Sequence, residues 1–244
     1  MVAREEEHTR QGMLFPFVPL TDSNSRMLDD FSKSMLRLNG YDYQILIIAK
    51  IFNRLDTGLI QLSQGKLDQF DLSYMLSDAI VVGPHIFNHY DATLKDFENI
   101  AFDWRTYPGS EERLEPKIAR AYNNVLGVKD YQRPDGASLN DEIEIMTKKI
   151  LAHQHKTLGV KYGNEYQIKR TREELGELNN LLTKTDRRSK DQLRMETLDE
   201  AYDFYGVTIR YPMLIKKINF NDINEILSHR LPLLHIEHIK MRGR

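Results

Sequence analysis

The sequence predicts an all-α fold, and two observations favour it. Apolar residues recur every three or four positions in one segment after another, which is the period of an amphipathic helix. Runs of alternating apolar and polar residues, typical of half-buried strands, are few anywhere in the 244 residues. The last four helical segments favour a four-helix bundle in the C-terminal half, preceded by an N-terminal helical extension.

Four helices are expected in the N-terminal part. Residues 22–25 offer capping side chains for the first helix, and Asn39-Gly40 ends it. Gly83-Pro84 is expected to stop the third helix, because proline lacks the N–H that a helix interior needs. Pro116 must lie in or near the first turn of the fourth helix. The expected ranges are 22–38, 42–57, 71–82 and 111–126.

Two further stretches suggest how the chain is organised. Within residues 1–21, Pro16 and Pro19 interrupt an otherwise apolar piece that begins at Met13, which favours an extended arm docked on a surface. Residues 131–138 are rich in turn formers and are the best linker candidate. We therefore divide the chain into an N-terminal helical region, 1–138, of unassigned role and a helical domain, 139–244. The helices expected in that domain are 139–158, 165–183, 193–211 and 221–239.

Composition excludes several classes of function. The chain has 34 Lys and Arg against 36 Asp and Glu, so it lacks the basic balance of a dedicated nucleic-acid binder. It has no cysteine, which removes thiol nucleophiles and Cys-ligated zinc. The longest apolar run, residues 45–49, is far shorter than a membrane span, and the first residues are charged. We therefore expect a cytoplasmic protein without membrane association.

Carboxylates are concentrated on two of the expected C-terminal helices. At 100° per residue, Glu174 and Glu177 lie side by side next to an apolar stripe. Glu196, Glu200 and Asp203 lie along one line of a helix that is apolar over most of its surface. Such a row is costly unless a positive charge neutralises it. Two antiparallel helices of this kind would point four carboxylates into one space, which is the geometry of a hard-cation site. The alternative is a solvated helix face, because Glu is common there.

The acids also fall into a recognisable order of motifs. Residues 173–177 have the pattern E-E-x-x-E, and Glu200 with Asp203 gives E-x-x-D after one short connection. Glu196 with Asp199 also fits E-x-x-D by spacing, but its flanking pattern is poorer. Over residues 139–240 the chain resembles the MazG-type, all-α nucleoside triphosphate pyrophosphohydrolases, whose signature combines these two motifs. The departures from that pattern are Arg230, at a position where the family commonly has Lys, and Pro232.

The resemblance implies a Mg²⁺-dependent enzyme that hydrolyses a (d)NTP or related nucleotide to the monophosphate and pyrophosphate. Mn²⁺ is expected to substitute for Mg²⁺, and the family implies a homodimer or homotetramer. The chemistry suits the residues, because negative oxygens shield the attacked phosphorus and a divalent ion screens their charge. The implied metal ligands are Glu174, Glu177, Glu200 and Asp203, and the implied catalytic residues are Glu173 and Glu174.

A basic connection between the two acidic helices is a candidate phosphate clamp, since Arg and Lys side chains bind phosphate oxygens. The alternative is an exposed, solubilising loop. Two rival functions also remain open at this point: a non-catalytic interaction protein on the same helical scaffold, and a structural or assembly protein such as a viral one. The candidate substrate-binding residues are Lys184, Arg187, Arg188, Lys190 and Arg230.

Overall fold

The computed structural model confirms an all-α protein over the residues that it describes. Those residues are 20–89, 93–102, 111–138, 142, 163–183 and 189–240. They form helices and connecting turns, with no strand among them. The expected arm 1–21, apart from its last two residues, and nearly all of the expected helix 139–158 lie outside this part. The four-helix arrangement of the C-terminal half therefore stays a prediction.

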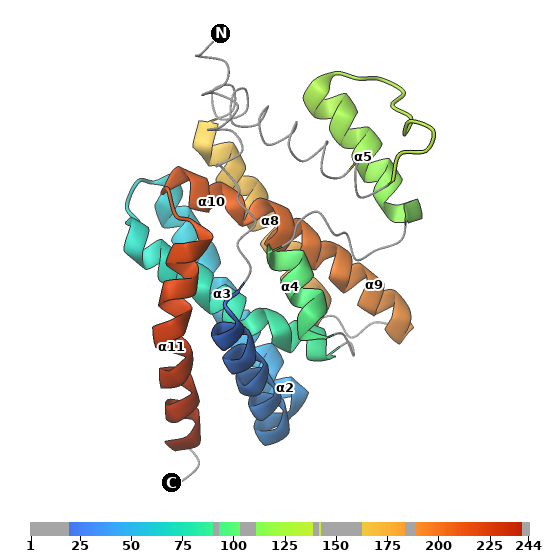
Figure 1. Ribbon diagram of the computed structural model, residues 1–244. Coiled ribbons are helices and arrows are strands. Elements are labelled where there is room, and N and C mark those ends of the chain that lie inside the picture. The colour runs from blue at the N-terminus through green and yellow to red at the C-terminus, as the bar shows by residue number, and fades with distance from the viewer. Residues whose placement is uncertain are drawn as a thin grey trace.

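Figure 1 shows how the helices are arranged. In chain order, the described elements are α2 (Asp22–Ser63), α3 (Gln69–His89), α4 (Leu94–Phe102), α5 (Glu111–Leu126), α8 (Gly163–Thr183), α9 (Lys190–Ala201), the π-helix η2 (Tyr202–Thr208), α10 (Arg210–Ile215) and α11 (Phe220–Lys240).

The α2 helix is broken where the sequence predicts a break, but it ends later than the sequence predicts. Gly40 has φ 73° and ψ 178°, so it divides α2 into two helical pieces, as expected. The second piece continues past Gly58 to Ser63, so the predicted end before Gly58 is wrong. A Cβ atom on Gly58 would overlap with Sδ of Met75 in α3. This glycine permits close helix packing instead of ending the helix.

The prediction that Gly83-Pro84 stops a helix is also wrong, because α3 continues through both residues to His89. Ile86 and Phe87, which follow the proline, are at most 1% exposed, and their burial favours continuation of the helix. A Cβ on Gly83 would overlap with the ring of Phe97 in α4. The glycine is therefore a point of close approach between α3 and α4.

One hydrophobic core joins helices from both sides of residue 138. The α2 helix packs on α3, α8 and α11, and α4 packs on α3 and η2. The rings of Phe52 and Phe204 meet edge to face with centroids 5.8 Å apart, and the buried Tyr205 hydroxyl donates to the carbonyl of Ala79 at 2.7 Å. The division into regions 1–138 and 139–244 stays a prediction, but the two share this core.

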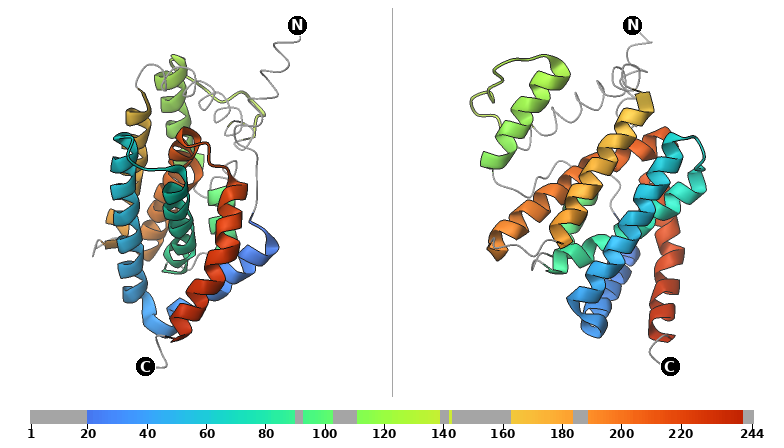
Figure 2. Two further views of the ribbon diagram at one scale, coloured as in Figure 1. Left: turned by 90° about the vertical axis from the view of Figure 1, so that its left-hand side faces the viewer. Right: turned by 180° about the vertical axis from the view of Figure 1, so that it is seen from behind.

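In Figure 1 and in the right view of Figure 2, α5 lies at one edge of the packed helices, although its buried Ile118 and Tyr122 belong to the same hydrophobic core. Among the described helices, α5 packs extensively against no other. It follows the expected range, Glu111–Leu126, with Pro116 inside its second turn. None of the described helices combines the length and apolar character that crossing a lipid bilayer requires.

Candidate metal centre

Three of the four carboxylates predicted as metal ligands come together in the structure. Glu174 of α8, Glu200 of α9 and Asp203 of η2 each offer an oxygen, and these oxygens lie within 4.8 Å of one another. Glu174 is only 6% exposed, and the other two residues are partly buried. We call Glu174, Glu200 and Asp203 the carboxylate cluster.

The apolar stripe of α8 positions Glu174. Ile168, Leu175 and Leu178 are at most 2% exposed, so this stripe faces the core, as its spacing predicts. Glu174 directly precedes the buried Leu175 and therefore lies at the edge of the core. One turn earlier, the buried hydroxyl of Thr171 donates to the backbone carbonyl of Thr208 at 2.9 Å. This hydrogen bond fixes α8 against the end of η2.

A π-helical segment positions Asp203. The sequence predicts one helix over 193–211, but the structure divides this range into α9, η2 and α10. The N–H of Ile209 donates to the carbonyl of Phe204, five residues earlier, at 2.9 Å. Arg210 donates to the carbonyl of Gly206 within η2 at 2.9 Å and to that of Ala101 in α4 at 3.2 Å, and so links the π-helix to α4. Short π segments often occur at functional sites.

Burial and mutual repulsion determine the protonation of the carboxylate cluster. Burial, followed by the charge of Asp203, raises the pKa of Glu174 from 4.5 to about 7. The same two causes raise the pKa of Glu200 to about 7, and Glu177 adds to the repulsion at both glutamates. Burial also raises the pKa of Asp203. All three carboxyls are therefore harder to ionise in the folded protein than in water.

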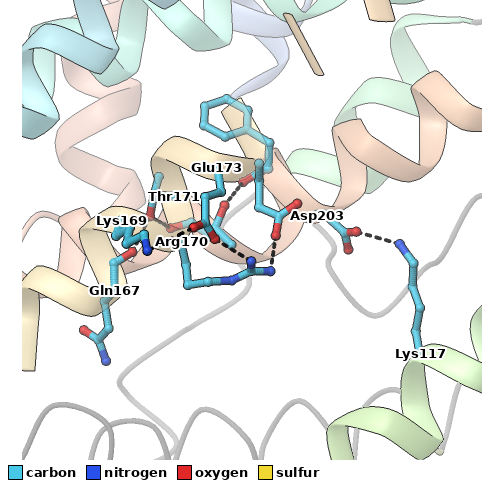
Figure 3. Close-up of polar contacts among 10 residues, drawn as sticks. Lys117, Gln167, Lys169, Arg170, Thr171, Glu173 and Asp203 are labelled. Carbon is cyan, nitrogen blue, oxygen red and sulfur yellow. Dashed lines mark hydrogen bonds and ion pairs between the residues drawn. The ribbon is translucent and has the colours of Figure 1, made fainter. Parts of the chain in front are cut away.

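Two cations contact the carboxylate cluster, as Figure 3 shows in part. Arg170 donates from Nη1 to Glu173 at 2.6 Å and from Nη2 to Glu174. Lys117 of α5 places Nζ 2.6 Å from Oδ2 of Asp203 and 3.0 Å from Oδ1 of Asp199. The charges of Arg170 and Lys117 lower the pKa of Glu174 but do not offset its burial.

Neither cation is among the site residues that the sequence predicts. Arg170 stands four residues before Glu174, and this helical ion-pair spacing is a signal that could have found it. Lys117 lies 86 residues before Asp203, on a helix that matches no motif. Only the three-dimensional structure brings it to the cluster.

The remaining acidic candidates lie beside the cluster. Glu177 is exposed and lies outside the group of three, although its charge acts on both clustered glutamates. Glu173 has a side chain that is 38% exposed, with Lys169 at 3.7 Å in addition to Arg170. Their predicted roles, Glu177 as a ligand and Glu173 as a catalytic residue, stay predictions.

The basic candidates divide into two groups. Arg230 of α11 forms an ion pair with the buried Asp78 of α3 and lies over the ring of Tyr74, 5.6 Å from its centroid. Its guanidinium is thus engaged between α11 and α3, and its predicted role in substrate binding stays a prediction. Lys184, Arg187 and Arg188 lie outside the described residues, as does the side chain of Lys190.

The carboxylate cluster has the chemistry of a hard-cation site. Its donors are carboxylate oxygens, which Mg²⁺ and Mn²⁺ prefer. Oε2 of Glu200 is buried and accepts no hydrogen bond from any described residue. An uncompensated buried carboxylate oxygen is costly, and a bound cation would compensate it. The three residues therefore fit a divalent cation, with coordination positions left for water or substrate.

Comparisons of the chain with protein-family models, with curated proteins and with solved structures found no match.

Proposed function

We propose that this protein is a Mg²⁺-dependent nucleotide pyrophosphohydrolase, which cleaves a (d)NTP or a related nucleotide to the monophosphate and pyrophosphate. The observation that supports it is the convergence of Glu174, Glu200 and Asp203 within 4.8 Å. Glu174 belongs to the E-E-x-x-E motif, and Glu200 and Asp203 form the E-x-x-D motif. Residues 178–199 separate the two motifs in the chain, so the folded helices are what bring their carboxylates together.

The proposed roles follow from the contacts of each side chain. A divalent cation, when bound, screens the phosphate charge and lowers the pKa of a bound water. Glu174, Glu200 and Asp203 would hold that cation. Arg170 holds Glu173 and Glu174 in fixed orientations through its two Nη atoms. Glu173, partly exposed beside the cluster, is the proposed acceptor of the proton from the attacking water.

A pyrophosphate-release assay tests this function. The full chain is incubated with Mg²⁺ and a panel of common, modified and alarmone nucleotides, and the released pyrophosphate is measured. We expect release from at least one nucleotide, loss of release with EDTA, and a fall of at least about 100-fold in kcat for Glu174→Gln.

The matched control is Glu225→Gln, which changes an exposed glutamate on α11 in the same chemical way. It is expected to keep the activity of the natural chain. Absence of pyrophosphate release across the whole panel would sink the proposed enzyme. Equal loss of activity in both variants would show that the loss does not depend on the position of the glutamate in the cluster.

A second candidate function is a non-catalytic interaction protein on the same scaffold. The observation that favours it is the engagement of Arg230 by Asp78 and Tyr74, because this residue departs from the lysine common in the family. This candidate predicts no pyrophosphate release and an unchanged thermal midpoint when Mn²⁺ is added.

A further inference from the structure

Among the described residues, Lys117 brings the N-terminal region to the carboxylate cluster. Its Nζ lies 2.6 Å from Asp203 and 3.0 Å from Asp199, and its side chain is 26% exposed. The helix that bears it, α5, packs extensively against no other described helix. Figure 3 shows the side chain extending from α5 toward Asp203. The ammonium is thus at a partly exposed rim of the cluster.

The bonding of Lys117 leaves part of its ammonium available. An ammonium group has three N–H donors, and Asp203 and Asp199 account for two of them. The third has no partner among the described residues. Arg170 differs, because its two Nη atoms are engaged by Glu173 and Glu174, so it orients carboxylates.

The location of this third donor, which is free among the described residues, matches the charge of the proposed substrate. A phosphate held beside Asp203 comes within reach of the ammonium, because Lys has a flexible four-carbon stem. A cation at the rim also reduces the repulsion between an anionic substrate and the carboxylates.

We propose that Lys117 is a substrate-binding residue that contacts the phosphates of the nucleotide, so that α5 and the acidic helices form one site together. This inference rests on the proposed function. It also assigns a role to the N-terminal region, which supplies a cation that the two acidic motifs lack.

Two measurements on Lys117→Gln test the inference, because they are expected to change in opposite directions. Loss of the positive charge strengthens the attraction of the cluster for a divalent cation. Titration calorimetry with Mn²⁺ alone should therefore show binding that is unchanged or up to about 10-fold tighter. Binding of an α,β-methylene triphosphate analogue with Mn²⁺ should weaken about 10-fold or more, with a matching rise in KM.

Two further variants separate substrate binding from a structural role. Lys117→Arg retains the charge and should recover most of the analogue affinity, whereas Lys129→Gln, an exposed control after α5, should resemble the natural chain. If Lys117→Gln leaves analogue affinity and KM unchanged, the inference is overturned. It is also overturned if Mn²⁺ and analogue affinity fall together, because that result indicates a damaged site.

The two assays also distinguish failure of this inference from failure of the proposed function. A natural chain that binds the analogue without releasing pyrophosphate disproves the hydrolase, and weaker binding in Lys117→Gln then still supports the role of Lys117. A natural chain that releases pyrophosphate with unchanged kinetics in Lys117→Gln supports the hydrolase and disproves the role of Lys117. A natural chain that neither binds nor cleaves overturns both.

Discussion

The buried carboxyl of Glu200 is unfavourable in its ionised form unless a cation binds it. Its Oε2 is buried without a hydrogen-bond partner among the described residues, and burial and Asp203 raise its pKa to about 7. Above neutral pH the ionised form therefore opposes folding. A bound divalent cation removes this conflict, because it stabilises the same ionised oxygen.

Replacement of Glu200 by Gln should stabilise the metal-free protein and remove its response to metal. At pH 8 we expect the thermal midpoint to rise by about 2–4 °C, because the neutral amide removes the repulsion within the cluster. Addition of Mn²⁺ should raise the midpoint of the natural chain and not that of the variant. Thermal unfolding with and without Mn²⁺ measures both effects. A full response to Mn²⁺ in the variant would contradict the prediction.

The pH dependence of stability follows from the same residues. In the folded, metal-free chain, the pKa of Glu174 and of Glu200 is raised from 4.5 to about 7. The folded state therefore binds protons more tightly than the unfolded state. The stability that this proton binding contributes is lost as pH rises through about 7. A double variant, Glu174→Gln with Glu200→Gln, serves as the reference, because the other titrating groups affect the stability of both proteins alike.

We expect the thermal midpoint of the natural chain, relative to that double variant, to fall as pH rises from about 4.5 to about 8. Saturating Mn²⁺ should remove the decline, because it favours the ionised carboxylates. A relative midpoint that rises over this range would show that the carboxyls have lowered pKa values in the fold.

At this scale the sequence predicts the acids better than their counter-ions. Helical periodicity is local, so it places Glu174 beside an apolar stripe, and the structure confirms this position. The convergence of Glu200 and Asp203 with Glu174 follows from two helices packing together. Lys117 could not be predicted, because its contact depends on chain segments distant in sequence.

At the scale of the helices, the close contact between α3 and α4 depends on a glycine, which has no side chain. A Cβ on Gly83 would overlap with the ring of Phe97, which is fully buried. Gly83→Ala should therefore destabilise the protein by about 1–3 kcal/mol, as overpacking of a core does. The measurement is the free energy of unfolding in urea.

Gly176→Ala is the matched control, because a Cβ there meets no atom within 4 Å and the residue lies inside α8. It should leave stability unchanged or raise it by up to about 1 kcal/mol. Equal effects of the two substitutions would contradict the packing argument for Gly83.

The helix ends show where sequence signals succeed and fail. Gly40 has a positive φ that favours glycine, so its local signal and its structural role agree. Gly58 and Gly83 are present because neighbouring helices approach closely, and a single sequence contains no sign of that approach. The π-helix η2 is similarly absent from the sequence signals, because the side chain that bonds its Gly206 carbonyl, Arg210, lies beyond the range of η2.

At the scale of the whole molecule, the shared core bears on the division at residue 138. Phe204 packs against Phe52 and Tyr205 against Phe97, with centroids 5.8 and 5.2 Å apart. Arg172 of α8 also forms a bidentate ion pair with Asp56 of α2, at 2.6 and 3.1 Å. Removal of the N-terminal region would expose these aromatic rings to water.

A fragment of residues 139–244 should therefore show no cooperative thermal transition and no stabilisation by Mn²⁺, although it contains every predicted metal ligand. The loss of apolar burial from η2 alone disfavours the segment that positions Asp203. Co-expression of residues 1–138 as a separate chain should restore both properties, because it restores the core and Lys117. Circular dichroism and calorimetry measure the outcome. A fragment that unfolds cooperatively and binds Mn²⁺ alone would instead demonstrate an independent C-terminal domain, with the N-terminal region as an addition to it.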